Sequence, residues 1–95
     1  MENYIIILDR DSTGDYVKFH DDFTKEKGIH YWWHYIKTMY IVRTDLNVEE
    51  LSGIVTRLLK KHSLNIRHLV VKSDLGDSQG MLPKVSWEWL ADKMG

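Results

Sequence analysis

The sequence predicts a single α+β domain in which an antiparallel sheet carries two helices on one face. Apolar segments short enough for strands alternate along the chain with longer segments of helical periodicity. The central stretch 29–44 is rich in aromatic and β-branched residues, which favours a β-hairpin over a helix. At 95 residues the chain is long enough for one domain with a modest core.

The first strand is predicted over 4–8, where a short, continuous apolar run is typical of a strand that is buried on both faces. A polar loop follows this strand. A helix is predicted over about 15–27 because aromatic residues recur there at helical spacing, and Gly28 suits its C-terminal end. The recurring residues are Tyr16, Phe19 and Phe23.

The hairpin is predicted as strands at about 30–36 and 39–44, joined by a tight turn at Lys37 and Thr38. Alternation then assigns the side chains to two faces. One face is expected to hold Trp32, His34 and Ile36 across from Met39 and Ile41. The other is expected to hold Trp33 and Tyr35 across from Tyr40 and Val42. Both faces are apolar, so the sheet needs a cover on each side.

The second helix has clear boundaries, since Asn47 can cap its N-terminus and Glu50 completes a capping box. Its buried stripe is predicted to be Leu51, Val55, Leu58 and Leu59. A fourth strand is predicted over 68–72. Pro83 then begins a short terminal helix. This helix carries Trp87, Trp89 and Leu90.

The order strand, helix, strand, strand, helix, strand is the ferredoxin-like βαββαβ pattern, with two helices on one face of the sheet. We expect one ferredoxin-like domain over 1–95, with the tail 81–95 packing on the sheet or on a partner subunit. The tail and a second copy of the chain would together cover the aromatic second face.

The composition excludes several classes of function. The net charge of -1 gives no overall basic excess, so nucleic acid would have to meet a local basic patch. The absence of cysteine excludes disulfides, thiolate metal sites and cysteine nucleophiles. No apolar run has membrane-spanning length and the N-terminus has no signal-peptide pattern, so we expect a cytoplasmic protein that does not contact a membrane.

Several motifs resemble a known family. They are Leu8-Asp9, Asp15-Tyr16, Trp32-Trp33-His34-Tyr35, Thr38 with Ile41-Val42, and Gly80-Met81-Leu82-Pro83 with Trp87-Glu88-Trp89. Over roughly residues 4–90 they resemble the SinR-like branch of a dimeric ferredoxin-like superfamily, which includes CRISPR-associated adaptation proteins and virulence-associated protein D. The resemblance implies a homodimer with its sheets packed face to face. It also implies either metal-assisted cleavage of RNA or DNA near Asp9 or a non-catalytic scaffold for nucleic acid.

Asp9 and Asp11 are the candidate metal ligands, because paired carboxylates suit Mg²⁺ or Mn²⁺. A metal ion held there would activate water or offset charge at a phosphodiester. Asp9 and His34 are the candidate catalytic residues, with the imidazole as a general base. The structural alternatives are that the two acids cap the turn that follows them and that His34 is a packed residue of the sheet.

Five basic residues are candidates for binding phosphates, with a solvated helix end as the alternative. They are Arg10, Arg57, Lys60, Lys61 and Arg67. We expect the dimer interface to include Trp33, Tyr35 and Tyr40, since indole and phenol rings bury much apolar area. Three functions remain open: a metal-dependent endoribonuclease-like nuclease, a non-catalytic homodimeric nucleic-acid scaffold, and a protein-interaction component of a toxin–antitoxin or phage-defence system.

Overall fold

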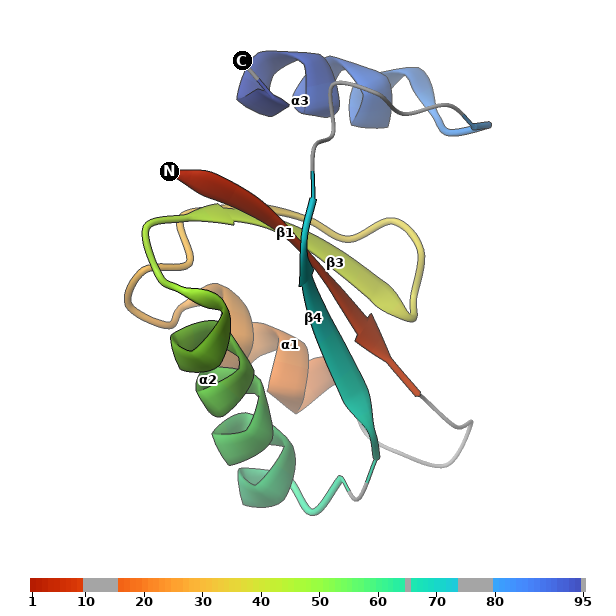
Figure 1. Ribbon diagram of the computed structural model, residues 1–95. Helices are drawn as coiled ribbons and strands as arrows, with labels where there is room; N and C mark the ends of the chain where they lie inside the picture. The colour runs from red at the N-terminus through yellow and green to blue at the C-terminus, as the bar shows by residue number, and fades with distance from the viewer. Residues whose placement is uncertain (10–15, 65, 74–79, 95) are drawn as a thin grey trace.

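The computed structural model describes residues 1–9, 16–64, 66–73 and 80–94, which form four strands and three helices. In chain order they are β1 (Glu2–Leu8), α1 (Tyr16–Thr24), β2 (Tyr31–Trp33), β3 (Met39–Thr44), α2 (Val48–Lys61), β4 (His68–Lys72) and α3 (Lys84–Met94). The strands pair antiparallel in the order β2-β3-β1-β4 (Figure 1). The α+β class is confirmed, and the arrangement is compatible with a ferredoxin-like fold.

Helices α1 and α2 cover one face of the sheet, which we call the first face (Figure 1). The core beneath them consists of alternate residues of β1 and β3 and the apolar stripes of both helices. Its most deeply buried side chains are Ile6, Phe19, Phe23, Tyr40, Val42, Leu51, Val55 and Leu58. The aromatic stripe of α1 and the leucine-rich stripe of α2 therefore lie where their periodicity predicts.

The N-terminus of α2 is fixed by the predicted capping box. The Glu50 amide donates to Asn47 Oδ1 at 2.8 Å, and the Asn47 amide donates to Glu50 Oε1 at 3.1 Å. These bonds satisfy amides that have no carbonyl partner within the helix. Interactions between residues close in sequence therefore determine α2, and its boundaries agree with the prediction.

Helix α1 ends at Thr24, three residues before the predicted end. The chain then turns through Gly28, whose φ of +94° lies in the region that glycine adopts readily. Thr44 at the end of β3 is 1% exposed and holds this turn, because its hydroxyl donates to the Gly28 carbonyl at 2.8 Å. A contact with β3, distant in sequence, thus fixes the connection that follows α1.

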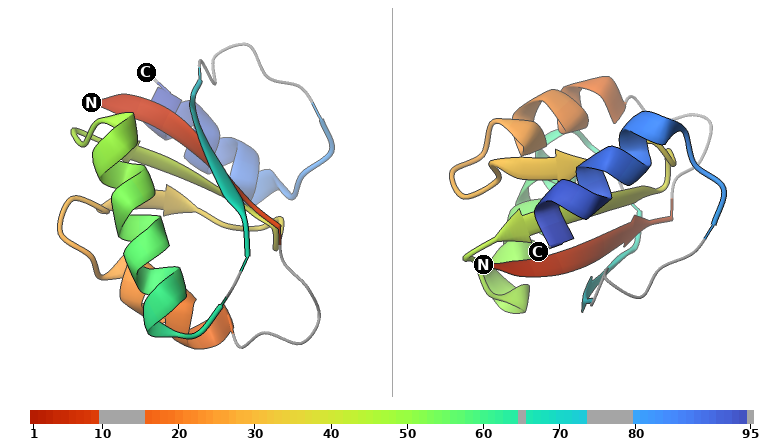
Figure 2. Two further views of the ribbon diagram at one scale, coloured as in Figure 1. Left: turned by 60° about the horizontal axis from the view of Figure 1, so that its bottom comes forward. Right: turned by 90° about the horizontal axis from the view of Figure 1, so that it is seen from above.

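Helix α3 packs on the opposite side of the sheet, which we call the second face (Figures 1 and 2). Trp33, Ile41 and Leu90 form the buried centre of this contact. Partly buried side chains surround them: Ile5, Met39, Leu82, Trp87 and Trp89. The expectation that both faces of the hairpin need a cover is therefore met, and the tail of the same chain supplies the second cover.

The predicted pairing within the hairpin is wrong by one residue. Trp33 pairs with Ile41 and Trp32 with Val42, whereas the predicted two-residue turn placed Trp33 opposite Val42. β2 covers only Tyr31–Trp33, and residues 34–38 form the connection. Because side chains alternate, a shift of one residue moves one strand's side chains to the opposite face relative to the other strand. Trp33 and Ile41 consequently share the second face.

Helix α3 leaves part of the second face uncovered. Ile7, Leu69 and Val71 are 44%, 57% and 41% exposed, and we call these three residues the open strip. Ile7 pairs with Leu69, and Val71 pairs with Ile5, so all three lie on the side of the sheet that α3 covers elsewhere. β4 is an edge strand, and the strip runs along that edge. Within the described ranges, no helix is long and apolar enough to span a membrane.

Candidate functional site

Asp9 lies directly after β1 with an exposed side chain. Its amide donates to the Arg67 carbonyl at 2.9 Å, which ties the end of β1 to the segment that enters β4. Asp9 lines a pocket of about 350 Å³, which we call the edge pocket. The other lining residues are Ile7, Arg67, His68 and Leu69. A carboxylate and a guanidinium therefore flank one opening at the edge of the sheet.

His68 also borders the edge pocket, but its imidazole lies on the first face of the sheet, because His68 pairs with the buried Leu8 and bonds to α2. Its Nε2 lies 2.8 Å from Ser52 Oγ, and burial lowers the pKa of the imidazole below its usual value of 6.5. His68 is therefore expected to be mainly neutral near pH 7. It acts here as an oriented hydrogen-bonding group.

The donor set at Asp9 fits one kind of divalent metal site. Mg²⁺ is commonly held by one or two carboxylates, with waters and substrate phosphates completing its shell. Asp9 offers one exposed carboxylate, and Asp11 lies outside the described residues. Among residues 1–9, 16–64, 66–73 and 80–94, no three His, Cys, Asp or Glu side chains are grouped closely enough to hold a metal ion. The described part thus supplies a single anionic ligand.

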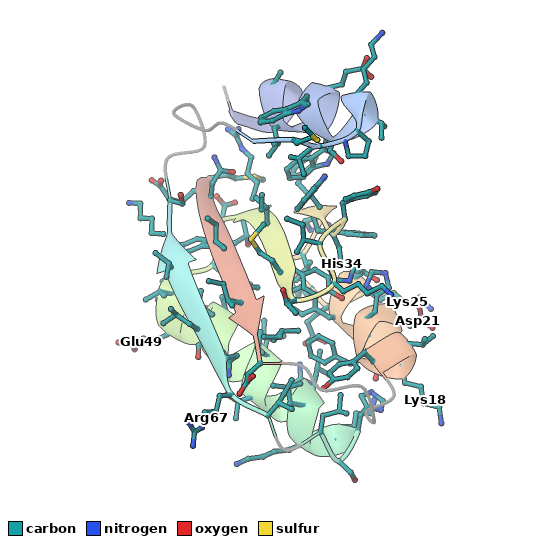
Figure 3. The ribbon with its side chains drawn as sticks, turned by 90° about the vertical axis from the view of Figure 1, so that its right-hand side faces the viewer. Lys18, Asp21, Lys25, His34, Glu49 and Arg67 are labelled. Carbon is teal, nitrogen blue, oxygen red and sulfur yellow. The ribbon has the colours of Figure 1, made fainter. Side chains whose placement is uncertain are left out.

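His34 lies in a different pocket from Asp9, so the structure does not bring the two predicted catalytic residues together. It lines a pocket of about 310 Å³ between α1 and the loop that follows β2, which we call the histidine pocket. Figure 3 shows His34 beside α1 and Arg67 well apart from it at the start of β4. The lining residues are Leu8, Tyr16, Val17, Phe19, His20, His34, Lys37 and Tyr40.

Sequence reasoning missed the residues that surround His34. The His34 ring is stacked on Tyr40 with centroids 3.9 Å apart, and its centroid lies 5.3 Å from that of His20. The available signal was the position of His20 directly after Phe19 and four residues after Tyr16, which places it on the buried side of α1. Lys37, assigned only to a turn, also lines the pocket.

The predicted phosphate-binding residues that the structure describes do not line one common pocket. Arg57 and Lys60 line a groove of about 840 Å³ between α2 and β4, where Arg57 is paired with Glu26. Lys61 contacts Asp22 at 2.9 Å, and this bond, followed by one from His62, lowers the pKa of Asp22. Arg67 lines the edge pocket, and Arg10 lies outside the described residues.

Two of the three predicted interface residues are buried within the protomer. Tyr40 is 2% exposed in the core of the first face, and Trp33 is 6% exposed beneath α3. Only Tyr35, at 61% exposure, is available for contact with another chain. The one-residue shift in the hairpin moves Tyr40 away from the face that Trp33 occupies, and α3 of the same chain buries Trp33.

Comparisons of the chain with protein-family models, with curated proteins and with solved structures find no match.

Proposed function

We propose that the protein is a homodimer that binds nucleic acid and cleaves phosphodiester bonds at Asp9. The observation that carries the proposal is the edge pocket, where an exposed carboxylate and an arginine line one opening at the end of β1, a central strand of the sheet. The resemblance to dimeric ferredoxin-like nucleic-acid proteins supports the same position.

Asp9 would hold Mg²⁺ or Mn²⁺ through its carboxylate. When bound, the metal ion would supply an activated water and offset negative charge at the phosphodiester. Arg67 would bind a phosphate oxygen pair, since its planar guanidinium matches that geometry.

The open strip supports the dimer. Three exposed apolar side chains lie together along the edge strand, and Ile7 and Leu69 also line the edge pocket. A second copy that covered the strip would remove this apolar surface from water. In a two-fold symmetric pair the same patch meets itself, so the two edge pockets would then lie on either side of one interface. The second pocket would contribute a second Asp9.

Cleavage is tested with RNA and DNA, single- and double-stranded, with Mg²⁺ or with chelator. We expect Asp9→Asn to abolish metal-dependent cleavage and to leave the melting temperature nearly unchanged, because the side chain is exposed. Asp21→Asn is the matched control, since Asp21 is an exposed carboxylate of α1 that lines neither pocket. Metal-dependent cleavage that persists in Asp9→Asn would refute the assignment. Salt-sensitive binding without cleavage would support the scaffold alternative, and neither binding nor cleavage would support the protein-interaction alternative.

The dimer is tested by light scattering. We expect a mass twice that of the 11.3 kDa chain and a monomer for Leu69→Glu, which places charge on the open strip. Val85→Glu is the control, because Val85 is 69% exposed on α3 and is not one of the three residues of that strip. A wild-type monomer at micromolar concentration would refute the dimer.

A further inference from the structure

The histidine pocket brings together two imidazoles and a phenol from three parts of the chain. His20 comes from α1, Tyr40 from β3, and His34 from the loop directly after β2. Both histidines are partly exposed, whereas Tyr40 is buried between them and the core. Asp9 lines the edge pocket and not the histidine pocket, so any chemistry in the histidine pocket is separate from the metal-assisted function proposed above.

His34 is held in one tautomer. Its Nδ1 lies 2.9 Å from the Met39 carbonyl oxygen. Because a carbonyl can only accept, Nδ1 carries the proton and Nε2 is the basic nitrogen of the neutral ring. The ring lies flat on Tyr40, with 8° between the two planes. Its orientation is therefore fixed by a hydrogen bond and by stacking, as the orientation of a general base must be.

His20 is held by a different kind of partner. Its Nδ1 lies 2.6 Å from the Tyr40 hydroxyl oxygen, and Trp32 packs edge-on against the ring at 5.1 Å. A hydroxyl can either donate or accept, so this bond can persist whether the imidazole is neutral or protonated. His20 can thus give up a proton and take it back without losing its orientation.

A cation completes the set. Lys37 lines the same pocket, and its ammonium group suits a phosphate oxygen. Transfer of the phosphoryl group of RNA to a neighbouring hydroxyl requires an oriented base, an oriented acid and a cation beside them. That reaction needs no metal ion, but it does need the 2′-hydroxyl of RNA as the nucleophile.

We propose that the histidine pocket is a general acid–base site that cleaves RNA without a metal ion. His34 Nε2 accepts the proton of the 2′-hydroxyl as its oxygen attacks the adjacent phosphorus. The bond from phosphorus to the 5′-oxygen breaks, and protonated His20 gives that oxygen its proton. The products are a 2′,3′-cyclic phosphate and a free 5′-hydroxyl. Lys37 offsets the charge on the phosphate oxygens, and Tyr40 is a positioning residue for both rings.

The test uses the full-length protein with excess chelator and a labelled single-stranded RNA that contains every dinucleotide step. We expect cleavage that leaves 2′,3′-cyclic phosphate ends, and none on the all-2′-deoxy strand of the same sequence. His34→Asn and His20→Asn should each lower the rate by about 10²–10⁴-fold, the usual contribution of general acid–base catalysis. Asparagine has a side-chain amide that can retain the bond to Met39 or to Tyr40.

Two variants make the result specific to this pocket. His30→Asn removes an exposed histidine that lines neither pocket, so its rate should equal that of the wild type. The excess chelator in the assay separates this site from the metal-assisted one, which needs its metal ion. Tyr40→Phe should lower the rate while the protein stays folded, as checked by its melting temperature. The proposal is overturned if RNA stays intact in chelator, if DNA is cut equally well, or if both asparagine variants keep the wild-type rate.

Discussion

Replacement of Leu90 by alanine measures how firmly α3 covers the second face. Leu90 is 3% exposed and packs with Trp33 and Ile41. Buried leucine-to-alanine changes cost about 2–5 kcal/mol, depending on how far the surroundings relax into the space. Among the described residues, the apolar cluster under α3 has three buried members and lies beneath a single helix, which can shift inward. We therefore expect a loss near the lower end, about 2–3 kcal/mol.

The assay is equilibrium unfolding in urea, followed by far-UV circular dichroism and by tryptophan fluorescence. Fluorescence reports on α3 directly, since Trp33, Trp87 and Trp89 all lie in or around its contact with the sheet. Val85→Ala is the matched control, because this α3 side chain is 69% exposed and its truncation should change stability by less than about 0.5 kcal/mol.

A loss in Leu90→Ala no larger than in Val85→Ala would refute the packing of α3 on the second face. If α3 instead separates before the rest of the domain unfolds, the fluorescence transition will come at lower urea than the circular dichroism transition. That outcome would be consistent with the packing of α3 on the second face and would show that α3 is a separate cooperative unit.

Further predictions concern Thr44 and His68. Thr44→Val should lower the free energy of unfolding by about 1–3 kcal/mol, because it removes the hydroxyl that donates to the Gly28 carbonyl at 2.8 Å and accepts from the Leu46 amide at 3.1 Å. Thr44→Ser keeps both bonds and should cost less, so equal losses in urea unfolding would contradict this reasoning. Burial lowers the pKa of His68 below 6.5, so the unfolded chain binds its proton first and His68 should reduce stability as pH falls below 6.5. An NMR titration should place its midpoint below 6.5, and a midpoint at or above that value would contradict the burial.

Of the secondary structure, α2 was the element most fully predictable from sequence. Its capping box and apolar stripe involve residues three or four positions apart, so local interactions alone determine them. β4 was predicted with the same bounds for a similar reason, since a short apolar run between polar segments marks a strand. The end of α1 was predicted less well, because the turn that follows it is held by Thr44 from a distant strand.

The candidate site was predictable only in part. Asp9 and His34 were both identified as side chains with useful chemistry, but their spacing in sequence gave no sign that they line different pockets. The partners of His34 are His20 and Tyr40, which come from α1 and β3. These three residues meet only because α1 packs across the sheet beside the end of β2.

The amino-acid pattern by itself determined that the hairpin is apolar on both sides and that the sheet must therefore be covered twice. Only the tertiary structure decided which residues lie on each side. The pairing register of β2 and β3 depends on where residues 34–38 leave the sheet and on how β3 packs against β1, α1 and α3. No local sequence pattern specifies these contacts. That choice buries Tyr40 beneath the two histidines and places Trp33 under α3.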